Sequence, residues 1–400
     1  MVKKLLLPLA ILLVIFVIAL AITTLFFSTS SLNSESNMTS APTSTPGATN
    51  TEPPEDAPMF AVVAENLDTP WALVFLPDQS ILVTERPGRV RFVKNDGTLQ
   101  EQPIATLENV REIGEGGLLG ITLHPNFSSN NYVYLYYTYA ESGGQTLNRV
   151  VRMTYENGQL QDEEIIVDEI PGAPNHNGGR IKFGPDNFLY ITTGDAQNPS
   201  LAQNTKSLAG KILRVADSGD PASGNPFGNA VYSYGHRNPQ GLAWDENGNL
   251  WSTEHGRSGV LSGLDELNLI ERGRNYGWQI IQGDETRTGM ETPKLHSGND
   301  TWAPAGAAFV NNSLFFAGLR GQALYESRLP APERSDGGQA VITNDEKISL
   351  NEHFKTDFGR LREVILGPDN LLYITTSNRD GRGNPIIDDD KIIRVNPSKL

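Results

Sequence analysis

The chain has 400 residues, a formal net charge of −15 and no cysteine. Without cysteine it can form no disulfide, no thiolate metal site and no cysteine nucleophile, and the negative charge argues against a nucleic-acid partner held through its phosphates. The first predicted element follows Lys3 and Lys4, where an uncharged apolar run extends over residues 5–27. A run of this length suits a membrane-spanning helix, and its basic start also suits a signal peptide.

Residues 1–27 are therefore expected to form a signal peptide or a membrane anchor, and we favour the anchor because no clean small-x-small cleavage site follows. Since the lysines stay on the inner side of the membrane, the rest of the chain is expected to be extracytoplasmic in either case. Residues 28–58 are rich in Ser, Thr, Pro and Asn and almost free of large apolar residues, which predicts a disordered linker. The folded domain is expected to span residues 59–400.

The folded part contains an internal repeat. Its clearest copies, Gly-Pro-Asp-Asn-Phe-Leu-Tyr-Ile-Thr-Thr and Gly-Pro-Asp-Asn-Leu-Leu-Tyr-Ile-Thr-Thr, and two weaker ones lie at 184–193, 367–376, 76–84 and 244–253. A second predicted strand follows three of them, at 88–90, 210–215 and 390–395. Short strands repeated between turns predict an all-β propeller of about six blades, each of about 50 residues. We expect the last strand, 391–395, to pair near residues 60–64 and close the ring.

A histidine-containing turn precedes one of these repeats. His176 lies in Asn-His-Asn-Gly-Gly-Arg at 175–180, and Asp195 follows the predicted strand 188–193. A hairpin would bring both residues to the same end of the sheet, where the carboxylate would orient the imidazole as a general base. Taken alone, a histidine in a glycine-rich turn is more often a surface residue, so the interpretation depends on its neighbours.

Four further segments accompany the hairpin. They are Gly-Gly-Leu-Leu-Gly at 116–120 with His-Pro at 124–125, Tyr-Gly-His-Arg-Asn-Pro-Gln-Gly-Leu at 234–242, Asp-Glu-Leu-Asn at 265–268 with Asn-Tyr-Gly-Trp at 275–278, and Arg-Leu-Arg-Glu-Val at 360–364. With them, residues 60–396 resemble the soluble pyrroloquinoline quinone (PQQ)-dependent glucose and aldose sugar dehydrogenases. The resemblance implies a six-bladed β-propeller that oxidises aldose sugars at the anomeric carbon to lactones, passing electrons from PQQ to an external acceptor.

The resemblance also implies roles for individual residues. His176 would be the general base, Asp195 would orient it, and Arg237 would stabilise the developing alkoxide. The residues it assigns to the anionic cofactor are Glu115, Arg237, Asn238, Arg320, Arg360 and Arg362. Arg360 and Arg362, two positions apart on a predicted strand, would share a face and fork onto carboxylates; the alternative is a solvated strand face. For Arg237 the alternative is a salt bridge in a helix or a turn.

Calcium is implied as a second cofactor. One ion would be held by the main-chain carbonyls of Gly256 and Arg257 and would polarise the quinone, and a structural ion would lie near Glu266 and Tyr276. Trp302 is similar to the aromatic residue that covers the substrate in the family, although a tryptophan of the hydrophobic core fits its sequence equally.

Two positions depart from the family pattern. Glu115 stands where the glucose enzymes carry glutamine, and a carboxylate beside an anionic cofactor is unfavourable unless calcium or an arginine offsets it. Arg257 replaces the usual proline, and extra residues at 260–263 lengthen the loop, which weakens the calcium assignment.

Two other classes of function remain. The chain is either the dehydrogenase, or a non-catalytic extracellular propeller that serves as a binding module, or a calcium-dependent lactonase-type hydrolase. The hydrolase would need a cluster of axial carboxylates that the sequence does not show. A binding module has no reason to keep a base at His176 together with Arg237, Arg360 and Arg362, so this combination favours the dehydrogenase.

Overall fold

The computed structural model describes residues 54, 56–259, 262–329, 333–334, 340–341 and 348–400. The predicted signal peptide or anchor at 1–27 lies outside the described residues, as does the predicted linker at 28–58 apart from residues 54 and 56–58. Within the described ranges, no helix is long and apolar enough to span a bilayer.

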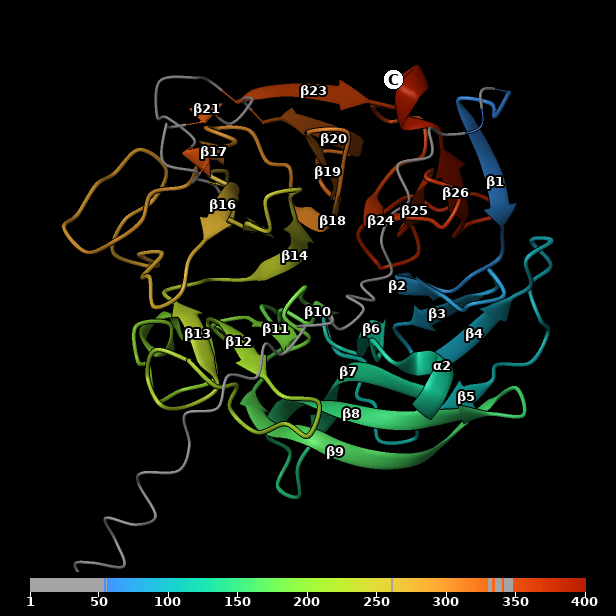
Figure 1. Cartoon of the computed structure of the whole chain (residues 1–400), viewed down its shortest axis with the longest axis horizontal. Helices are drawn as coiled ribbons and strands as arrows, with labels where there is room; N and C mark the ends of the chain where they lie inside the picture. The colour runs from blue at the N-terminus through green and yellow to red at the C-terminus, as the bar shows by residue number, and fades with distance from the viewer. Residues whose placement is uncertain (1–53, 55, 260–261, 330–332, 335–339, 342–347) are drawn as a thin grey trace, which may run out of the picture. The chain divides into compact units, whose positions relative to one another are not determined.

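The part of the chain that the structure describes forms six four-stranded antiparallel sheets and one separate two-stranded sheet. The six sheets surround a central axis as the blades of a β-propeller (Figure 1), with almost no helix. The predicted all-β, six-bladed propeller is therefore confirmed. In each blade the first strand lies nearest the axis, and the other three follow outward.

Blades one to three use consecutive strands. From the axis outward they are β2 (Pro70–Phe75), β3 (Ile81–Glu85), β4 (Arg89–Val93) and β5 (Ala105–Thr106); β6 (Leu118–Leu123), β7 (Tyr132–Ala140), β8 (Thr146–Glu156) and β9 (Gln159–Pro171); and β10 (Ile181–Phe183), β11 (Leu189–Thr193), β12 (Lys211–Val215) and β13 (Val231–Tyr234).

Blades four to six complete the ring. Their strands are β14 (Pro239–Trp244), β15 (Leu250–Glu254), β16 (Glu266–Ile270) and β17 (Leu295–His296); β18 (Pro304–Val310), β19 (Ser313–Gly318), β20 (Ala323–Arg328) and β23 (Ser349–His353); and β24 (Leu361–Leu366), β25 (Leu372–Thr376), β26 (Ile392–Val395) and β1 (Phe60–Ala64). The remaining elements are β21 (Glu333–Arg334), β22 (Ala340–Val341), the short helix α2 (Phe127–Asn130) and 3-10 turns at Pro199–Leu201 and Pro397–Lys399.

The repeat found in the sequence corresponds to the second strand of four blades, namely β3, β11, β15 and β25. Every residue of these strands is buried, because neighbouring blades cover both faces of a second strand. In three of these blades the aspartate of the preceding turn accepts a hydrogen bond from an aromatic side chain of the same strand. The bond from the Tyr190 hydroxyl to Asp186 Oδ2 is 2.9 Å long, and that from the Tyr373 hydroxyl to Asp369 Oδ2 is 3.0 Å long.

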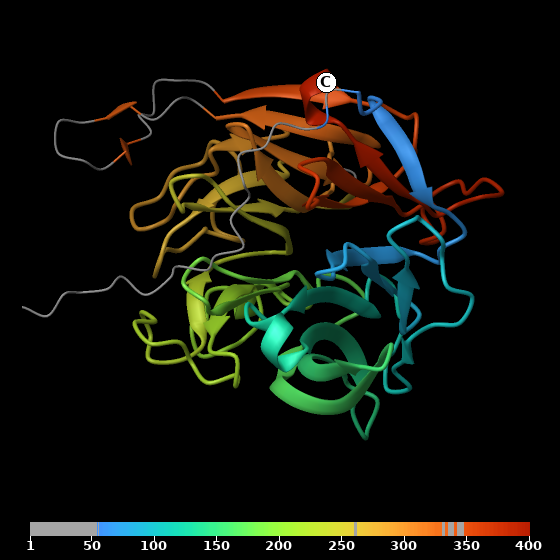
Figure 2. The ribbon, with the colours of Figure 1, turned by 45° about the vertical axis from the view of Figure 1, so that its right-hand side comes forward.

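The ring closes through β1, which pairs with β26 so that Phe60 lies opposite Val395 and Ala61 opposite Arg394. Figures 1 and 2 show β1, in blue, beside the red strands of the last blade. The predicted pairing of the last strand with residues 60–64 is therefore confirmed. An N-terminal strand thus completes the C-terminal blade and holds the first and last blades together.

Buried apolar side chains fill the space between neighbouring blades. Between blades five and six they include Ala305, Phe315, Leu324, Leu361 and Ile374. A fully buried leucine, isoleucine or phenylalanine contributes about 1.5–3 kcal/mol. This packing fixes the blades against one another, and with them the loops that carry the site.

Candidate active site

Most of the predicted site residues lie in loops, whereas Arg362 lies in β24 and Glu266 in β16. His176 lies before β10 and Asp195 after β11, and these strands are antiparallel with Ile181 opposite Ile191. Both residues therefore stand at the same end of the third blade, as the hairpin predicted. The connections that enter the first strands of other blades carry Glu115, Arg237, Asn238 and Arg360.

His176 and Asp195 form a hydrogen-bonded pair. Nδ1 of His176 lies 2.8 Å from Oδ1 of Asp195. Because a carboxylate only accepts hydrogen bonds, Nδ1 carries the hydrogen and Nε2 keeps a lone pair. The Nε1–H of Trp278 donates to Oδ2 of the same carboxylate at 2.8 Å, and the main-chain N–H of Gln197 donates to Oδ1 at 2.8 Å. The pair can therefore take up a proton at Nε2.

The backbone of His176 is held in an unusual conformation. Its φ is +63°, in the left-handed region, which costs a non-glycine residue roughly 1–3 kcal/mol. Its N–H donates to Oε2 of Glu115 at 3.1 Å, and its carbonyl accepts from the N–H of Ala196 at 3.2 Å. Gly194 is required beside it, because a Cβ there would lie 1.9 Å from the His176 carbonyl oxygen.

Arg237 and Asn238 lie between β13 and β14. The Arg237 guanidinium lies 5.3 Å from the ring centre of Trp278 and donates to Ser258 Oγ at 2.7 Å. The turn salt bridge considered for Arg237 is not formed among the described residues. Asn238 Oδ1 accepts from the N–H of Gly178 at 2.9 Å, while its Nδ2 is buried without a partner.

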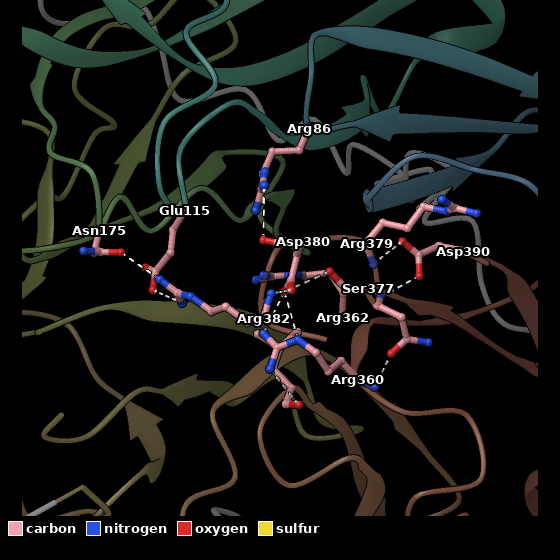
Figure 3. A network of polar contacts seen from close by, with 12 residues as sticks. Arg86, Glu115, Asn175, Arg360, Arg362, Ser377, Arg379, Asp380, Arg382 and Asp390 are labelled. Atoms are coloured by element: carbon pink, nitrogen blue, oxygen red, sulfur yellow. Dashed lines mark hydrogen bonds and ion pairs between the residues drawn. The ribbon is translucent and has the colours of Figure 1, made fainter. Parts of the chain in front are cut away.

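Arg360 and Arg362 are both buried, so the solvated strand face is excluded, but their partners differ (Figure 3). Nε and Nη2 of Arg360 both donate to Asp380 Oδ2, at 2.9 and 2.7 Å. Nη1 of Arg362 donates to Gln240 Oε1 at 2.6 Å, and among the described residues no carboxylate forms an ion pair with it. Burial lowers the pKa of Arg362 to about 9, which leaves it charged at neutral pH. The two arginines are thus not the equivalent pair that their spacing predicted.

A buried network from four blades fixes Arg362. The ring centre of Trp71 lies 4.3 Å from the guanidinium carbon of Arg180 and 5.6 Å from that of Arg362. Arg180 donates from Nε to the Gln240 carbonyl at 2.9 Å and forms an ion pair with Glu363. Because each partner is buried and comes from a different blade, the guanidinium of Arg362 has little freedom to move.

Several buried polar atoms around this network have no partner among the described residues. They are Arg362 Nε, Arg180 Nη2, Asn238 Nδ2 and His255 Nε2. The arginine and asparagine atoms are obligatory donors, and an unsatisfied buried donor costs about 1–3 kcal/mol. A planar anion with carboxylate and carbonyl oxygens would satisfy them, so these side chains fit a ligand of that chemistry.

His255 is buried near the charges of the site. Burial lowers its pKa to about 3; the Glu115 carboxylate opposes this shift, whereas Arg237, Arg362 and His176 add to it. His255 is therefore neutral at physiological pH, and it adds no charge to a site already rich in cations.

The structure places two predicted residues differently. Arg320 is exposed in the loop after β19, where its Nη1 donates to Ser262 Oγ at 3.2 Å. Trp302 is buried in the core, with its ring centre 5.5 Å from Phe316 and 5.7 Å from Tyr325. These contacts are those of a core tryptophan, one of the two alternatives left by the sequence, and the assignment of Trp302 to the substrate stays a prediction. The aromatic residue that touches the histidine's carboxylate partner is Trp278.

The four predicted calcium residues line one small cavity of about 10 Å³, enough for one water-sized sphere. They are Gly256, Arg257, Glu266 and Tyr276. Burial and the nearby carboxylate of Glu254 raise the pKa of Glu266 to about 8. The Tyr276 hydroxyl is already bonded, since it donates to the Leu269 carbonyl at 2.6 Å. Within the described ranges no three His, Asp or Glu side chains cluster as metal ligands, so an ion here would depend on main-chain oxygens.

Sequence reasoning gave no role to Trp278, Gln240 or Arg382. Trp278 and Gln240 stand inside the runs 275–278 and 235–241, so those runs already held the signal. For Arg382 the signal was the repeat itself. When its two clearest copies are aligned, the loop after β25, which carries Arg382, corresponds to the loop after β11, which carries Asp195.

The chain belongs to the glucose/sorbosone dehydrogenase family, whose model matches residues 67–391. It is therefore an oxidoreductase. The aldose sugar dehydrogenase of Escherichia coli K12 is 30% identical over 346 residues, which cover 80% of this chain and 90% of the relative. Quinoprotein glucose dehydrogenase B of Acinetobacter calcoaceticus is 32% identical over 260 residues, covering 57% of this chain and 54% of the relative.

A solved structure matches the whole propeller. The PQQ-bound aldose sugar dehydrogenase of Streptomyces coelicolor superposes with a TM-score of 0.74 and 38% identity, covering 86% of this chain and 98% of that one. The resemblance to sugar dehydrogenases found in the sequence is thus confirmed at the level of family and fold.

Proposed function

We propose that this protein oxidises aldose sugars at the anomeric carbon to lactones, with PQQ as its cofactor and an external acceptor for the electrons. The observation that carries the proposal is the free Nε2 of His176, set by the 2.8 Å bond from Nδ1 to Asp195. Support comes from the guanidinium of Arg362, which among the described residues forms no ion pair and has no acceptor for Nε, and from the PQQ-bound relative in Streptomyces coelicolor.

PQQ, when bound, supplies the oxidant that receives a hydride from the anomeric carbon. The residues of the chain do the rest. Nε2 of His176 takes the proton of the anomeric hydroxyl, and Asp195 stabilises the imidazolium that forms. Together the hydride and the proton account for the two hydrogens that the sugar loses on becoming a lactone.

Buried donors hold the cofactor in this proposal. Arg362 and Asn238 offer the unsatisfied Nε and Nδ2 atoms to its oxygens. Arg237, whose guanidinium makes its only side-chain hydrogen bond among the described residues to Ser258, places positive charge where the alkoxide develops. A non-catalytic binding module would need neither an oriented base nor an unpaired buried arginine.

Calcium is a further part of the proposal. Main-chain carbonyls of Gly256 and Arg257 would bind the ion that contacts the cofactor, and a structural ion would lie by Glu266 and Tyr276. The small cavity that these residues share supports the proposal. We also propose an extracytoplasmic location, secreted or membrane-anchored, which rests on the apolar run at 5–27 alone.

The test is reconstitution. Purified protein is dialysed against a chelator, mixed with calcium and PQQ, and assayed with a panel of aldoses and a redox dye. The proposal expects dye reduction with aldoses that depends on added PQQ. If PQQ binds and no aldose in the panel reduces the dye, the proposed reaction is wrong.

A further inference from the structure

The family resemblance left the carboxylate of Glu115 unexplained, and the structure shows what surrounds it (Figure 3). Oε1 of Glu115 accepts a hydrogen bond from Nη1 of Arg382 at 2.7 Å. Oε2 accepts from the main-chain N–H of His176 at 3.1 Å. One carboxylate therefore joins an arginine of the sixth blade to the backbone of the histidine of the third.

Arg382 has a second contact with the same turn. Its Nη2 donates to Oδ1 of Asn175 at 2.9 Å, next to His176 in the chain. The main-chain N–H of Glu115 also donates to the Pro174 carbonyl at 2.7 Å. Residues 174–176 are thus held at three successive positions, by Glu115 and Arg382 together.

Arg382 is itself anchored to the cofactor side of the site. Its main-chain N–H donates to Asp380 Oδ1 at 2.9 Å, and the other oxygen of Asp380 accepts both bonds from Arg360. Figure 3 shows this chain of contacts running from Arg360 through Asp380 and Arg382 to Glu115 and Asn175.

The charge state of Glu115 agrees with this role. Burial alone would raise its pKa, but His255 and Arg382 outweigh burial and bring the pKa to about 2. Among the described residues, Arg382 is the one cation that forms an ion pair with Glu115, at 2.7 Å. The sequence left calcium or an arginine as the group that offsets the carboxylate, and the structure shows an arginine, Arg382.

We infer that Arg382 and Glu115 are positioning residues that hold His176 in its left-handed backbone conformation, and so set where Nε2 lies. Neither touches the reacting atoms. A glutamine at 115 could not replace the carboxylate, because the His176 N–H and Arg382 bind different oxygens and a glutamine would turn its NH2 group toward one of these donors. The effect of this arrangement on turnover rests on the proposed function, whereas its effect on the backbone conformation of His176 does not.

The first test uses the full-length protein without cofactor. Hydrogen exchange, followed by mass spectrometry on peptides covering residues 172–180, is compared for wild type, Arg382→Gln and Arg379→Gln. Arg379 is the matched control because it lies in the same loop but donates to the Asp389 carbonyl, at 2.6 Å, and not to Glu115. Arg382→Gln should speed amide exchange at residues 175–177 by about tenfold, the factor expected for a lost charge-assisted hydrogen bond, and Arg379→Gln should not.

Glu115→Gln tests the same link from the other side, and covers the case in which Arg382→Gln fails to fold. It should also speed exchange by about tenfold, and the double variant should add little because both changes break one link. Unchanged amide exchange at residues 175–177 in Arg382→Gln and Glu115→Gln, or equal acceleration in Arg379→Gln, would overturn the inference.

The second test asks whether the hold matters for turnover. With PQQ and an aldose, Arg382→Gln should lower kcat about tenfold while PQQ affinity stays within about twofold of wild type. Parallel losses of kcat and PQQ affinity would show that Arg382 binds the cofactor and would overturn the positioning role. If wild type shows no turnover, the proposed function fails, and the exchange result still decides whether the link holds the turn.

Discussion

A hydrogen bond between Trp278 and Asp195 fixes the orientation of the Asp195 carboxylate. The indole Nε1–H donates to Asp195 Oδ2 at 2.8 Å, so that Oδ1 is the oxygen turned toward His176. The two residues are 83 positions apart in the chain and come from neighbouring blades. With the Gln197 N–H on Oδ1 as well, every polar neighbour of this carboxylate is a donor.

We therefore expect Asp195→Asn to remove activity although it keeps size and shape. If the amide oxygen of the introduced asparagine faces His176, the amide NH2 group faces the Trp278 N–H, and two donors oppose each other. If the amide oxygen faces Trp278, the NH2 group donates to Nδ1 of His176, and the imidazole hydrogen moves to Nε2. Either orientation impairs the base, and kcat/KM should fall by about 10²–10⁴. PQQ titration should remain near wild type, and a variant that keeps more than a tenth of kcat/KM would contradict the role of Asp195.

Arg360 and Arg362 should separate into two classes of effect. Arg362→Gln removes a guanidinium that has no ion-pair partner among the described residues. The change should weaken PQQ binding by about ten- to a hundredfold, as for one charge-assisted contact. Arg360→Gln leaves the buried carboxylate of Asp380 without its partner, so it should chiefly lower the melting temperature. Binding is followed by titration and stability by thermal unfolding of the apo protein. Equal loss of PQQ affinity in both variants would show that Asp380 does not neutralise Arg360.

The sequence was sufficient where local pattern decides structure. The repeat located the second strands, the hairpin placed His176 beside Asp195, and the last strand paired as expected. Contacts between distant loops could not be predicted from the sequence. Glu115 and Arg382 are 267 positions apart, and nothing in their local sequence relates them. The sequence left two alternatives for Trp302 for a similar reason, because only the packing of the fifth blade shows that its ring lies among Phe316 and Tyr325.

The free energy of unfolding should depend on the charge of Glu115. Its pKa of about 2 in the folded protein lies below the ordinary value of 4.5, so the unfolded chain takes up the proton first. The stabilisation is therefore present above about pH 4.5 and is lost as the pH falls toward 2. Other carboxylates also protonate in this window, so the difference between wild type and Glu115→Gln isolates the effect. This difference in the free energy of unfolding, measured with urea, should be smaller at pH 3 than at pH 6. A difference that stays constant would contradict the lowered pKa of Glu115.

Calcium removal tests the metal part of the proposal. Chelation should lower the melting temperature, because an ion that binds only the folded protein stabilises it by mass action. Added calcium should restore stability and PQQ-dependent activity, whereas magnesium should do so poorly since it demands tighter octahedral geometry. A chelated, dialysed sample that keeps its melting temperature and becomes active with PQQ alone would show that the lengthened loop after Arg257 holds no calcium.

The central claim is that His176 is the base, and single-turnover reduction of bound PQQ tests it most directly. Wild type and His176→Gln are each loaded with PQQ and calcium, mixed with excess aldose, and followed by the absorbance of the quinone. We predict equal PQQ loading and reduction at least about a hundredfold slower in His176→Gln. Reduction at the wild-type rate in that variant would contradict the account.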